Sequence, residues 1–188
     1  MFQGREVLIG ISGGIAAYKT AVLVSRLVQA GAGVSVIMTR SATQLVRPKT
    51  FEALTGRPVR WRMFGPGSHP HLEAAAQAEL LCIAPATANL LAKAALGLAD
   101  DLLSTVLLAF EGPVILAPAM NPRMWNKPAV QRNVRQLQED GFLLIGPEEG
   151  YVSCGMVGMG RMAEPEKIFQ CIQKILTERT PQLPFPNP

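Results

Sequence analysis

A glycine-rich stretch near the N-terminus has the residue types of an anion-binding turn. Ser12, Gly13, Gly14 and Ile15 follow an apolar run over residues 7–11 and precede a helical pattern. Glycines allow the backbone to turn sharply and approach an anion, the serine adds a hydroxyl group, and a helix N-terminus presents free amides. The stretch therefore predicts a phosphate site, while a tight strand-to-helix turn without a ligand is the alternative that these residues also allow.

The residues after the second predicted strand bear on which phosphorylated ligand is bound. Thr39, Arg40 and Ser41 stand where a nicotinamide dinucleotide would require an acidic residue for its ribose. Arg40 would suit a 2′-phosphate, so a phosphorylated dinucleotide stays open as an alternative. A mononucleotide is the simpler prediction, because it needs no acidic residue at this point.

Two loops of small residues follow the third and fourth predicted strands, and each begins with Ala-Pro-Ala. Small residues let a flat ring lie against the backbone, while hydroxyl and amide side chains can bond its polar edge. Asn89 precedes an apolar helix and would serve equally as a helix cap. The candidate ligand contacts in the two loops are Ala86, Thr87, Ala88, Asn89, Ala119 and Asn121.

The histidines and cysteines supply the groups that react near neutral pH. His71 lies upstream of the first Ala-Pro-Ala loop and is expected to act as an acid, a base or a thiol-activating group, whereas His69 suits a surface loop. Cys154 lies in a glycine-rich segment, expected to be a mobile flap, where it can donate a proton or act as a nucleophile. Cys82 and Cys171 are expected to be inert core residues. No metal is expected, because no cysteine or acidic residue stands at ligand spacing from either histidine.

Short β-branched runs alternate with longer helical patterns and indicate how these residues are positioned. Strands are expected at 7–11, 34–38, 80–84, 114–117 and 142–145, and helices at 15–29, 89–97, 101–110, 128–139 and 165–176. This alternation predicts an α/β fold: a three-layer, doubly wound parallel sheet of Rossmann-like or flavodoxin-like type, forming a single domain. Its ligand should lie at the carboxyl ends of the strands, where the candidate residues stand.

The composition limits the class of protein. The chain has 188 residues, of which 48% are hydrophobic and 6% aromatic, and this excludes intrinsic disorder. Three scattered cysteines exclude a disulfide-rich module and favour a reducing compartment, so a cytoplasmic location is expected. An apolar run over 80–99 contains polar residues and a proline, so no membrane span is expected. Residues 1–178 are expected to form the domain and the proline-rich residues 179–188 a disordered tail.

The net charge of +4 does not predict nucleic-acid binding. The densest basic stretch lacks interleaved aromatic residues over any length, which a nucleic-acid surface usually has. It is expected instead to form a solvated rim that attracts a phosphorylated small molecule. The stretch contains Arg40, Arg47, Lys49, Arg57, Arg60 and Arg62.

Four stretches taken together resemble the flavin-dependent cysteine decarboxylases. They occur in the order found in that family, and the similarity runs from about residue 5 to residue 175. The stretches are residues 12–19, residues 85–89, residues 118–121 with Met124-Trp125, and Cys154-Gly155 followed by Gly158, Gly160 and Arg161-Met162.

The resemblance implies FMN as cofactor and a homotrimer with each flavin near a subunit boundary. The FMN phosphate would lie near residues 12–15, with further contacts from Thr39 and Ser41, and residues 86–89 would lie along the isoalloxazine ring. His71 matches the active-site histidine, Asn121 the asparagine that binds the substrate carboxylate, and Cys154 the flap cysteine.

The implied reaction is loss of carbon dioxide from a cysteinyl group. The similarity is greatest to the family members that convert 4′-phosphopantothenoylcysteine to 4′-phosphopantetheine in coenzyme A biosynthesis. In such a reaction the thiol side is oxidised, which creates an acceptor for the carbanion; decarboxylation yields an ene-thiol, and Cys154 supplies the proton when the ene-thiol is reduced. The ligase that bifunctional relatives carry would then be on another chain.

Two positions depart from the family pattern and leave other substrates open. Met156 replaces an acidic residue after the flap cysteine, and Ala76 replaces a Lys or Arg five residues after the active histidine. The alternatives are decarboxylation of a peptide's C-terminal cysteine, which retention of Cys154 disfavours; flavin prenyltransfer, which the 118–121 motif disfavours; and a non-catalytic FMN-binding regulatory subunit.

Overall fold

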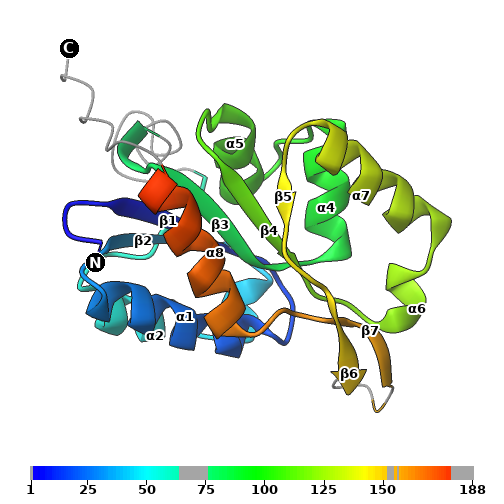
Figure 1. Ribbon diagram of the computed structural model, residues 1–188, viewed down its shortest axis with the longest axis horizontal. Helices are drawn as coiled ribbons and strands as arrows, with labels where there is room; N and C mark the ends of the chain where they lie inside the picture. Colours follow the sequence, from blue (N-terminus) through cyan, green and yellow to red (C-terminus); the bar gives the residue numbers. More distant parts are fainter. Residues whose placement is uncertain (1, 64–75, 152–154, 156, 179–188) are drawn as a thin grey trace.

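Five parallel strands form the central sheet of the computed structural model, which describes residues 2–63, 76–151, 155 and 157–178 (Figure 1). Their order across the sheet is β2-β1-β3-β4-β5. This is the flavodoxin-like order, in which the chain passes over β1 between β2 and β3. The strands are β1 (Glu6–Ile11), β2 (Gly33–Met38), β3 (Leu80–Ala86), β4 (Val114–Pro118) and β5 (Leu143–Leu144).

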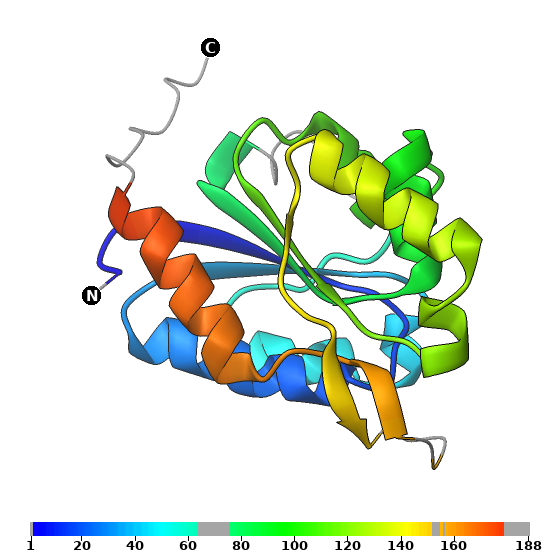
Figure 2. The same cartoon turned by 45° about the vertical axis from the view of Figure 1, so that its right-hand side comes forward.

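Helices cover both faces of this sheet, which gives three layers (Figure 2). One face carries α1 (Ala17–Gln29), α2 (Pro48–Thr55) and α8 (Pro165–Glu178), and the other carries α4 (Ala88–Leu96), α5 (Leu102–Ala109) and α7 (Pro128–Glu139). Two short helices, η1 (Ala42–Gln44) and α6 (Pro122–Trp125), lie in the loops after β2 and β4.

Alternation along each strand divides the core into two layers. Leu80, Cys82 and Ala84 of β3 pack against α1 and α8, while Leu81 and Ile83 pack against α4 and α5. All seven residues of β3 are buried, because a central parallel strand is covered on both faces. This explains why the strand reads as a continuous apolar run in the sequence.

The predicted fold class is confirmed, and so are all five predicted strands and all five predicted helices, with shifts at their ends. The single turn η1 was not predicted, and neither were two α-helices. One is α2, although Pro48 stands in its first turn and Gly56 ends it in a left-handed conformation (φ 68°). The other is α6, a single turn that begins at Pro122. The periodic apolar pattern is too short in both to stand out.

A β-hairpin was missed within the segment expected to be a flap. Strands β6 (Glu148–Tyr151) and β7 (Val157–Arg161) pair in antiparallel fashion. Three of their residues are glycines, so the alternation that predicts a strand is absent. The two arms of the segment are therefore paired strands, and its mobility as a flap stays a prediction.

No helix within the described ranges has both the length and the apolar character that a membrane crossing requires.

Candidate active site

The predicted ligand residues come together at the carboxyl ends of the strands. Because the five strands are parallel, the residues that follow β1, β2, β3 and β4 all lie at one edge of the sheet. Strands β1 and β3 are neighbours, and the chain reverses direction across the sheet between them. In folds of this type such a switch point opens a crevice for a ligand. The structure thus joins segments that are up to 110 residues apart in the sequence, which no local pattern could show.

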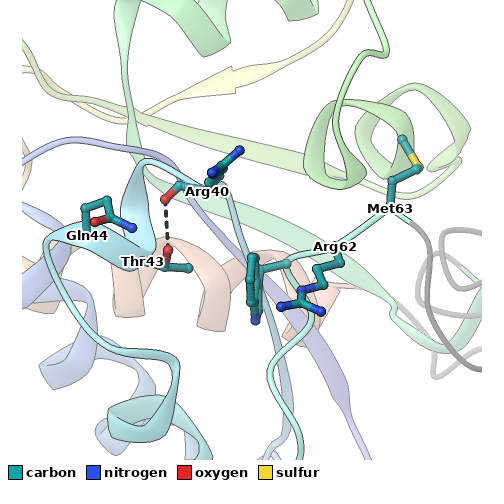
Figure 3. Close-up of a pocket in the computed structure, with 6 residues that line it drawn as sticks. Arg40, Thr43, Gln44, Arg62 and Met63 are labelled. Atoms are coloured by element: carbon teal, nitrogen blue, oxygen red, sulfur yellow. Dashed lines mark hydrogen bonds between the residues drawn. The ribbon is translucent and has the colours of Figure 1, made fainter.

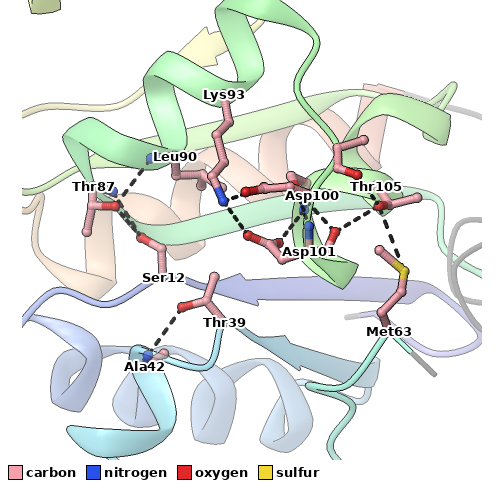
Figure 4. Close-up of polar contacts among 12 residues, drawn as sticks. Ser12, Thr39, Ala42, Met63, Thr87, Leu90, Lys93, Asp100, Asp101 and Thr105 are labelled. Carbon is pink, nitrogen blue, oxygen red and sulfur yellow. Dashed lines mark hydrogen bonds and ion pairs between the residues drawn. The ribbon is translucent and has the colours of Figure 1, made fainter. Parts of the chain in front are cut away.

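The Ser12 side chain joins the first turn to the loop after β3 (Figure 4). Its hydroxyl donates to the carbonyl of Pro85 at 2.7 Å and accepts from the backbone amide of Thr87 at 3.0 Å. The Thr87 Oγ1 lies 3.2 Å away. Ser12 is buried, so its hydroxyl fixes the relative position of the two loops, and its direct contact with a phosphate stays a prediction.

Gly13 lies directly against the loop after β2. A β-carbon at this position would overlap the β-carbon of Ser41. The first turn of α1 has no side-chain cap: Ala16 occupies the capping position, and no side chain of the described residues accepts from the helix amides there. Within the turn, the amides of Gly14 and Ala17 donate to the carbonyls of Ser12 and Gly14 at 2.8 and 2.9 Å. A turn of small residues at the start of a helix without a side-chain cap suits an anion, because the helix dipole favours negative charge there.

Thr39 is held between β1 and the short helix that follows it. Its backbone amide donates to the carbonyl of Ile11 at 2.9 Å, and its Oγ1 accepts from the amide of Ala42 at 3.2 Å. Thr39 therefore stands beside the end of β1, as a contact with the same ligand would require. That contact stays a prediction.

Thr87, and not Asn89, caps the helix after β3. The Thr87 Oγ1 accepts from the amide of Leu90 at 3.4 Å, whereas Asn89 is exposed within the first turn of α4. The alternative that Asn89 is a helix cap is therefore wrong. Ala86 is the last, fully buried residue of β3, and Ala88 is half-buried beside it.

The loops after β3 and β4 are bonded to each other by their backbones. The amide of Ala119 donates to the carbonyl of Ala86 at 3.1 Å. Asn121 caps α6: its Oδ1 accepts from the amide of Arg123 at 2.8 Å. This bond fixes the orientation of the carboxamide group at the same sheet edge as the Gly13 turn. The two small-residue loops thus form one continuous wall.

The β6–β7 hairpin rests on the loop after β4. The amide of Met120 donates to the carbonyl of Gly160 at 2.9 Å. Gly160 has φ +151°, and a β-carbon there would overlap the Met120 carbonyl oxygen, so only glycine permits this approach. The hairpin is thereby placed next to Asn121.

Ion pairs tie the base of the hairpin to the rest of the fold. Arg161 Nη2 lies 3.1 Å from Glu164 Oε1, which Lys19 Nζ of α1 also approaches at 3.0 Å. Lys167 Nζ lies 2.7 Å from Glu148 Oε1, and this bond, ahead of the contribution from Arg161, lowers the pKa of the Glu148 carboxyl group. The charges of β6, β7 and α8 therefore neutralise one another and hold the hairpin's base in place.

Three residues singled out from the sequence lie outside the described ranges: His69, His71 and Cys154. Met156 lies outside them as well, while Ala76 is exposed.

The other two cysteines, Cys82 and Cys171, lie at packed positions, as the sequence predicts. Cys82 is fully buried in β3, and burial raises the pKa of its thiol; Cys171 of α8 is half-buried and its thiol pKa is raised for the same reason. Both are therefore protonated and unreactive near neutral pH.

A partly buried lysine of α4, which faces the start of α5, was not singled out from the sequence. Lys93 Nζ lies 2.7 Å from Asp101 Oδ2 and also contacts Asp100 (Figure 4). Burial alone would lower the pKa of Lys93, but the hydrogen bonds that its ammonium group donates to both aspartates outweigh it and raise the pKa above its usual value. Asp101 also caps α5 through the amide of Ser104 at 2.9 Å. The spacing Asp-x-x-Ser is a capping signal that could have been read from the sequence.

Within residues 2–63, 76–151, 155 and 157–178, no group of three or more His, Cys, Asp or Glu side chains is arranged to hold a metal ion.

The order of the strands defines a flavodoxin-like α/β protein, and the turn before α1 and the wall of small residues suit a ligand with a phosphate group and a flat ring. The family model "Flavoprotein" matches residues 1–177. The chain belongs to the Flavoprotein family, and the resemblance noted from its motifs is confirmed.

Relatives of known sequence include the coenzyme A biosynthesis bifunctional protein CoaBC of Bacillus subtilis. It is 50% identical over 183 residues, which cover 96% of this chain and 45% of the relative. The CoaBC of Escherichia coli is 43% identical over 165 residues, covering 86% of this chain and 41% of the relative. The chain thus spans less than half the length of these relatives.

Solved structures include FMN-dependent cysteine decarboxylases. SpaF, described as such an enzyme, superposes with a TM-score of 0.82 and 36% identity, covering 93% of this chain and 97% of SpaF. A cysteine-to-serine mutant of a PPC decarboxylase, complexed with pantothenoylaminoethenethiol, superposes with a TM-score of 0.82. It is 31% identical in sequence, and the match covers 92% of this chain and 98% of that one. The family name and these neighbours indicate that the cofactor is a flavin.

Proposed function

We propose that the protein is an FMN-dependent carboxy-lyase that decarboxylates 4′-phosphopantothenoylcysteine to 4′-phosphopantetheine, a step of coenzyme A biosynthesis, in the cytoplasm. The observation that carries the proposal is the joining of three ligand loops at one edge of the sheet through the contacts of Ser12 with Thr87 and of Ala119 with Ala86. The CoaBC relatives and the PPC decarboxylase structure support the choice of substrate.

The residues at this edge fit FMN. The turn of residues 12–15 at the start of α1 would hold the phosphate, and Thr39 and Ser41 would add hydroxyl donors beside it. The small residues Ala86, Ala88 and Ala119 would face the isoalloxazine ring, with Thr87 and Asn89 at its polar edge, and Ile15, in the turn before α1, would lie near the phosphate. Bound FMN supplies a reversible hydride acceptor, so the substrate thiol can be oxidised before decarboxylation and the ene-thiol reduced after it.

The chain's own residues would bind the substrate and move its protons. Asn121 would donate a hydrogen bond from its carboxamide to the substrate carboxylate and hold it until carbon dioxide leaves. His71 would either take the proton of the substrate thiol or position that thiol. Cys154 would give a proton to the ene-thiol during its reduction, so that the product is the saturated thiol.

Replacing Cys154 tests this assignment. We expect Cys154→Ser to release carbon dioxide in one turnover and then stop, with the ene-thiol as product and the flavin absorbance bleached. Mass spectrometry of the product and the flavin spectrum measure both. Cys171→Ser is the matched control, since that thiol lies in α8, and it should turn over normally. Continued formation of saturated product by Cys154→Ser would contradict the role.

The parent protein gives the most direct test of the function. We expect it to purify yellow with FMN and to release carbon dioxide from 4′-phosphopantothenoylcysteine. A second candidate is a peptide ending in cysteine, which the equal likeness to SpaF, a cysteine decarboxylase, favours. Turnover of such a peptide but not of phosphopantothenoylcysteine would select that candidate. Bound flavin without turnover of either substrate would select a regulatory subunit.

A homotrimer is part of the proposal, and an exposed apolar face supports it. Ile15, in the turn before α1, and Tyr18 and Val22, in its first turns, are 57%, 60% and 52% exposed and follow one another at intervals of three and four residues. Their burial against another subunit would place residues 12–15, the turn predicted to hold the FMN phosphate and called the flavin turn below, near the subunit boundary. We expect Val22→Glu to convert the trimer to monomers in sedimentation analysis, whereas Lys49→Glu, at an exposed polar position of α2, leaves it intact. A trimer that survives Val22→Glu would remove this face from the interface.

A further inference from the structure

A cavity of about 590 Å³ opens beside the predicted flavin turn (Figure 3). Its volume lies within the range of pockets that hold small-molecule ligands. The residues that line it come from two segments about 20 positions apart in the sequence. They are Arg40, Thr43 and Gln44, after β2, and Trp61, Arg62 and Met63.

Backbone pairing at the edge of the sheet brings these two segments together. Arg60 forms a parallel bridge with Ile37 of β2. Its amide donates to the carbonyl of Val36 at 3.1 Å, and its carbonyl accepts from the amide of Met38 at 2.9 Å. Because the bridge is parallel, the residues that follow Arg60 leave the sheet at its carboxyl end, like the residues that follow Met38. The cavity therefore lies at the ligand-binding edge.

Two guanidinium groups give the cavity a positive charge. Arg40 and Arg62 line it, and no acidic side chain among the described lining residues balances them. Neither arginine forms an ion pair within the described part of the chain, whereas Arg57 of the same basic stretch binds Glu6. Two unneutralised guanidinium groups at one cavity favour an anion with several oxygen atoms, because the planar forks match phosphate geometry.

Neighbouring residues hold both arginines in place. The guanidinium carbon of Arg62 lies 4.4 Å from the centre of the Trp61 ring. Such stacking fixes the plane of the group and leaves its N–H donors at the edges for another partner. The Thr43 hydroxyl donates to the carbonyl of Arg40 at 2.8 Å and fixes the turn that carries that arginine.

The cavity adjoins the flavin turn but is built from other residues. Arg40 stands between Thr39 and Ser41, and the β-carbon of Ser41 lies against Gly13. A ligand in the cavity would therefore lie next to the phosphate end of the predicted FMN site. The turn of residues 12–15 is the separate place proposed for the FMN phosphate.

We propose that Arg40 and Arg62 bind the phosphate monoester of the substrate, and so make the enzyme selective for the phosphorylated form. This inference rests on the proposed function, since it assigns one end of that substrate to the cavity. The reacting cysteinyl end and the phosphate are at opposite ends of the molecule, so a subsite for the phosphate acts on affinity and leaves the chemical step to other residues.

Kinetics with and without the substrate's phosphate test the proposal. For the flavin-loaded parent protein we expect kcat/KM for 4′-phosphopantothenoylcysteine to exceed that for pantothenoylcysteine at least about tenfold, as for a charged partner that is bound by guanidinium groups. The double variant Arg40→Gln/Arg62→Gln should raise KM for the phosphorylated substrate by about the same factor and abolish the preference. KM for pantothenoylcysteine should stay the same within about twofold. Arg47→Gln is the matched control, because Arg47 is an exposed arginine of the same stretch that does not line the cavity.

The outcomes separate this inference from the proposed function. A parent protein that decarboxylates both substrates equally well would overturn the subsite and leave the function standing. If the double variant loses affinity for FMN in titrations of apoprotein but keeps its preference for the phosphorylated substrate, the arginines serve the cofactor phosphate, and the inference is wrong. A parent protein that decarboxylates neither substrate would overturn the function and the subsite together.

Discussion

The basic stretch of residues 40–62 is divided between the two ends of the sheet, and the two ends treat its arginines differently. At the amino ends of the strands, Arg57 binds Glu6 through both nitrogens, at 2.6 and 2.9 Å. At the carboxyl ends, Arg40 and Arg62 face a cavity whose described lining contains no acidic residue. The charge of Arg57 is neutralised within the fold, whereas the charges of Arg40 and Arg62 remain available to bind an anionic ligand.

The direction of the helices gives a physical reason for this difference. In a parallel α/β sheet, each helix that follows a strand starts at the carboxyl edge, so its positive dipole end and unbonded amides point there. An acidic side chain at that edge would compete with an anionic ligand. At the amino edge no such ligand is expected, and acidic residues such as Glu6 and Glu79 can pair with Arg57 and Arg5. The same residue type therefore stabilises one end and recognises a ligand at the other.

The largest effect is expected at the carboxyl end, from Gly13→Ala. The added β-carbon would overlap that of Ser41, and since the turn approaches its ligand through bare backbone, we expect the bound FMN per subunit to fall at least about tenfold. The flavin absorbance of the purified protein measures this.

A double-mutant cycle gives Gly13→Ala its control. Ser41→Gly removes the obstructing β-carbon together with the hydroxyl proposed to bind FMN, so its own flavin content is the reference. Gly13→Ala should lower the flavin content of Ser41→Gly little further. Equal losses in both backgrounds would show that the overlap is not the cause.

A smaller effect, on stability and not on ligand binding, is expected from Asp101→Asn. The asparagine keeps the helix cap but loses the charge paired with Lys93, so we expect the free energy of unfolding to fall by roughly 1 kcal/mol at neutral pH. Although burial would raise the pKa of Asp101, the hydrogen bonds from Lys93 and Ser104 lower it below its usual value. The charge therefore stabilises the fold above about pH 4, and this contribution is lost as the pH falls through the lowered pKa.

Urea unfolding of both proteins at a series of pH values tests this expectation. The difference between parent and Asp101→Asn should shrink below about pH 4. Glu111→Gln, at an exposed position, serves as the control and should show no such trend. A difference that stays constant down to acid pH would mean that the charge of Asp101 is not its source.

The smallest effect is expected from Arg57→Gln. Both partners are partly exposed, so the ion pair should contribute about 0.5–1 kcal/mol to the free energy of unfolding. KM for the phosphorylated substrate should not change, in contrast to the Arg40→Gln/Arg62→Gln variant. A rise in KM for Arg57→Gln would show that general positive charge, and not the cavity, attracts the substrate.

Much of the fold could be predicted because its signals are local. The apolar run over 7–11 and the helical spacing over 128–139 report burial of a strand and of one helix face, and both elements are found there. The hairpin β6–β7 could not be predicted in this way. Its position against the loop after β4 depends on the close approach of Gly160 to the Met120 carbonyl, and nothing in the sequence near Gly160 identifies that partner.

For the site, residue types determined the candidates, and the tertiary structure decided their neighbours. The sequence alone identified Gly13, Asn121 and the Ala-Pro-Ala loops as candidate ligand contacts, because backbone freedom, a carboxamide group and small size are properties of the residues themselves. It could not decide that Thr87 caps α4 while Asn89 does not, since both stand at plausible capping positions and only the backbone conformation selects between them. It placed Arg40, Arg57 and Arg62 in one solvated rim, but only the parallel bridge of Arg60 with Ile37 sends Arg62 to the ligand edge, while Glu6 holds Arg57 at the opposite end. Charge is a property of the sequence, but whether a charge is neutralised depends on which partner the fold brings within a few ångströms of it.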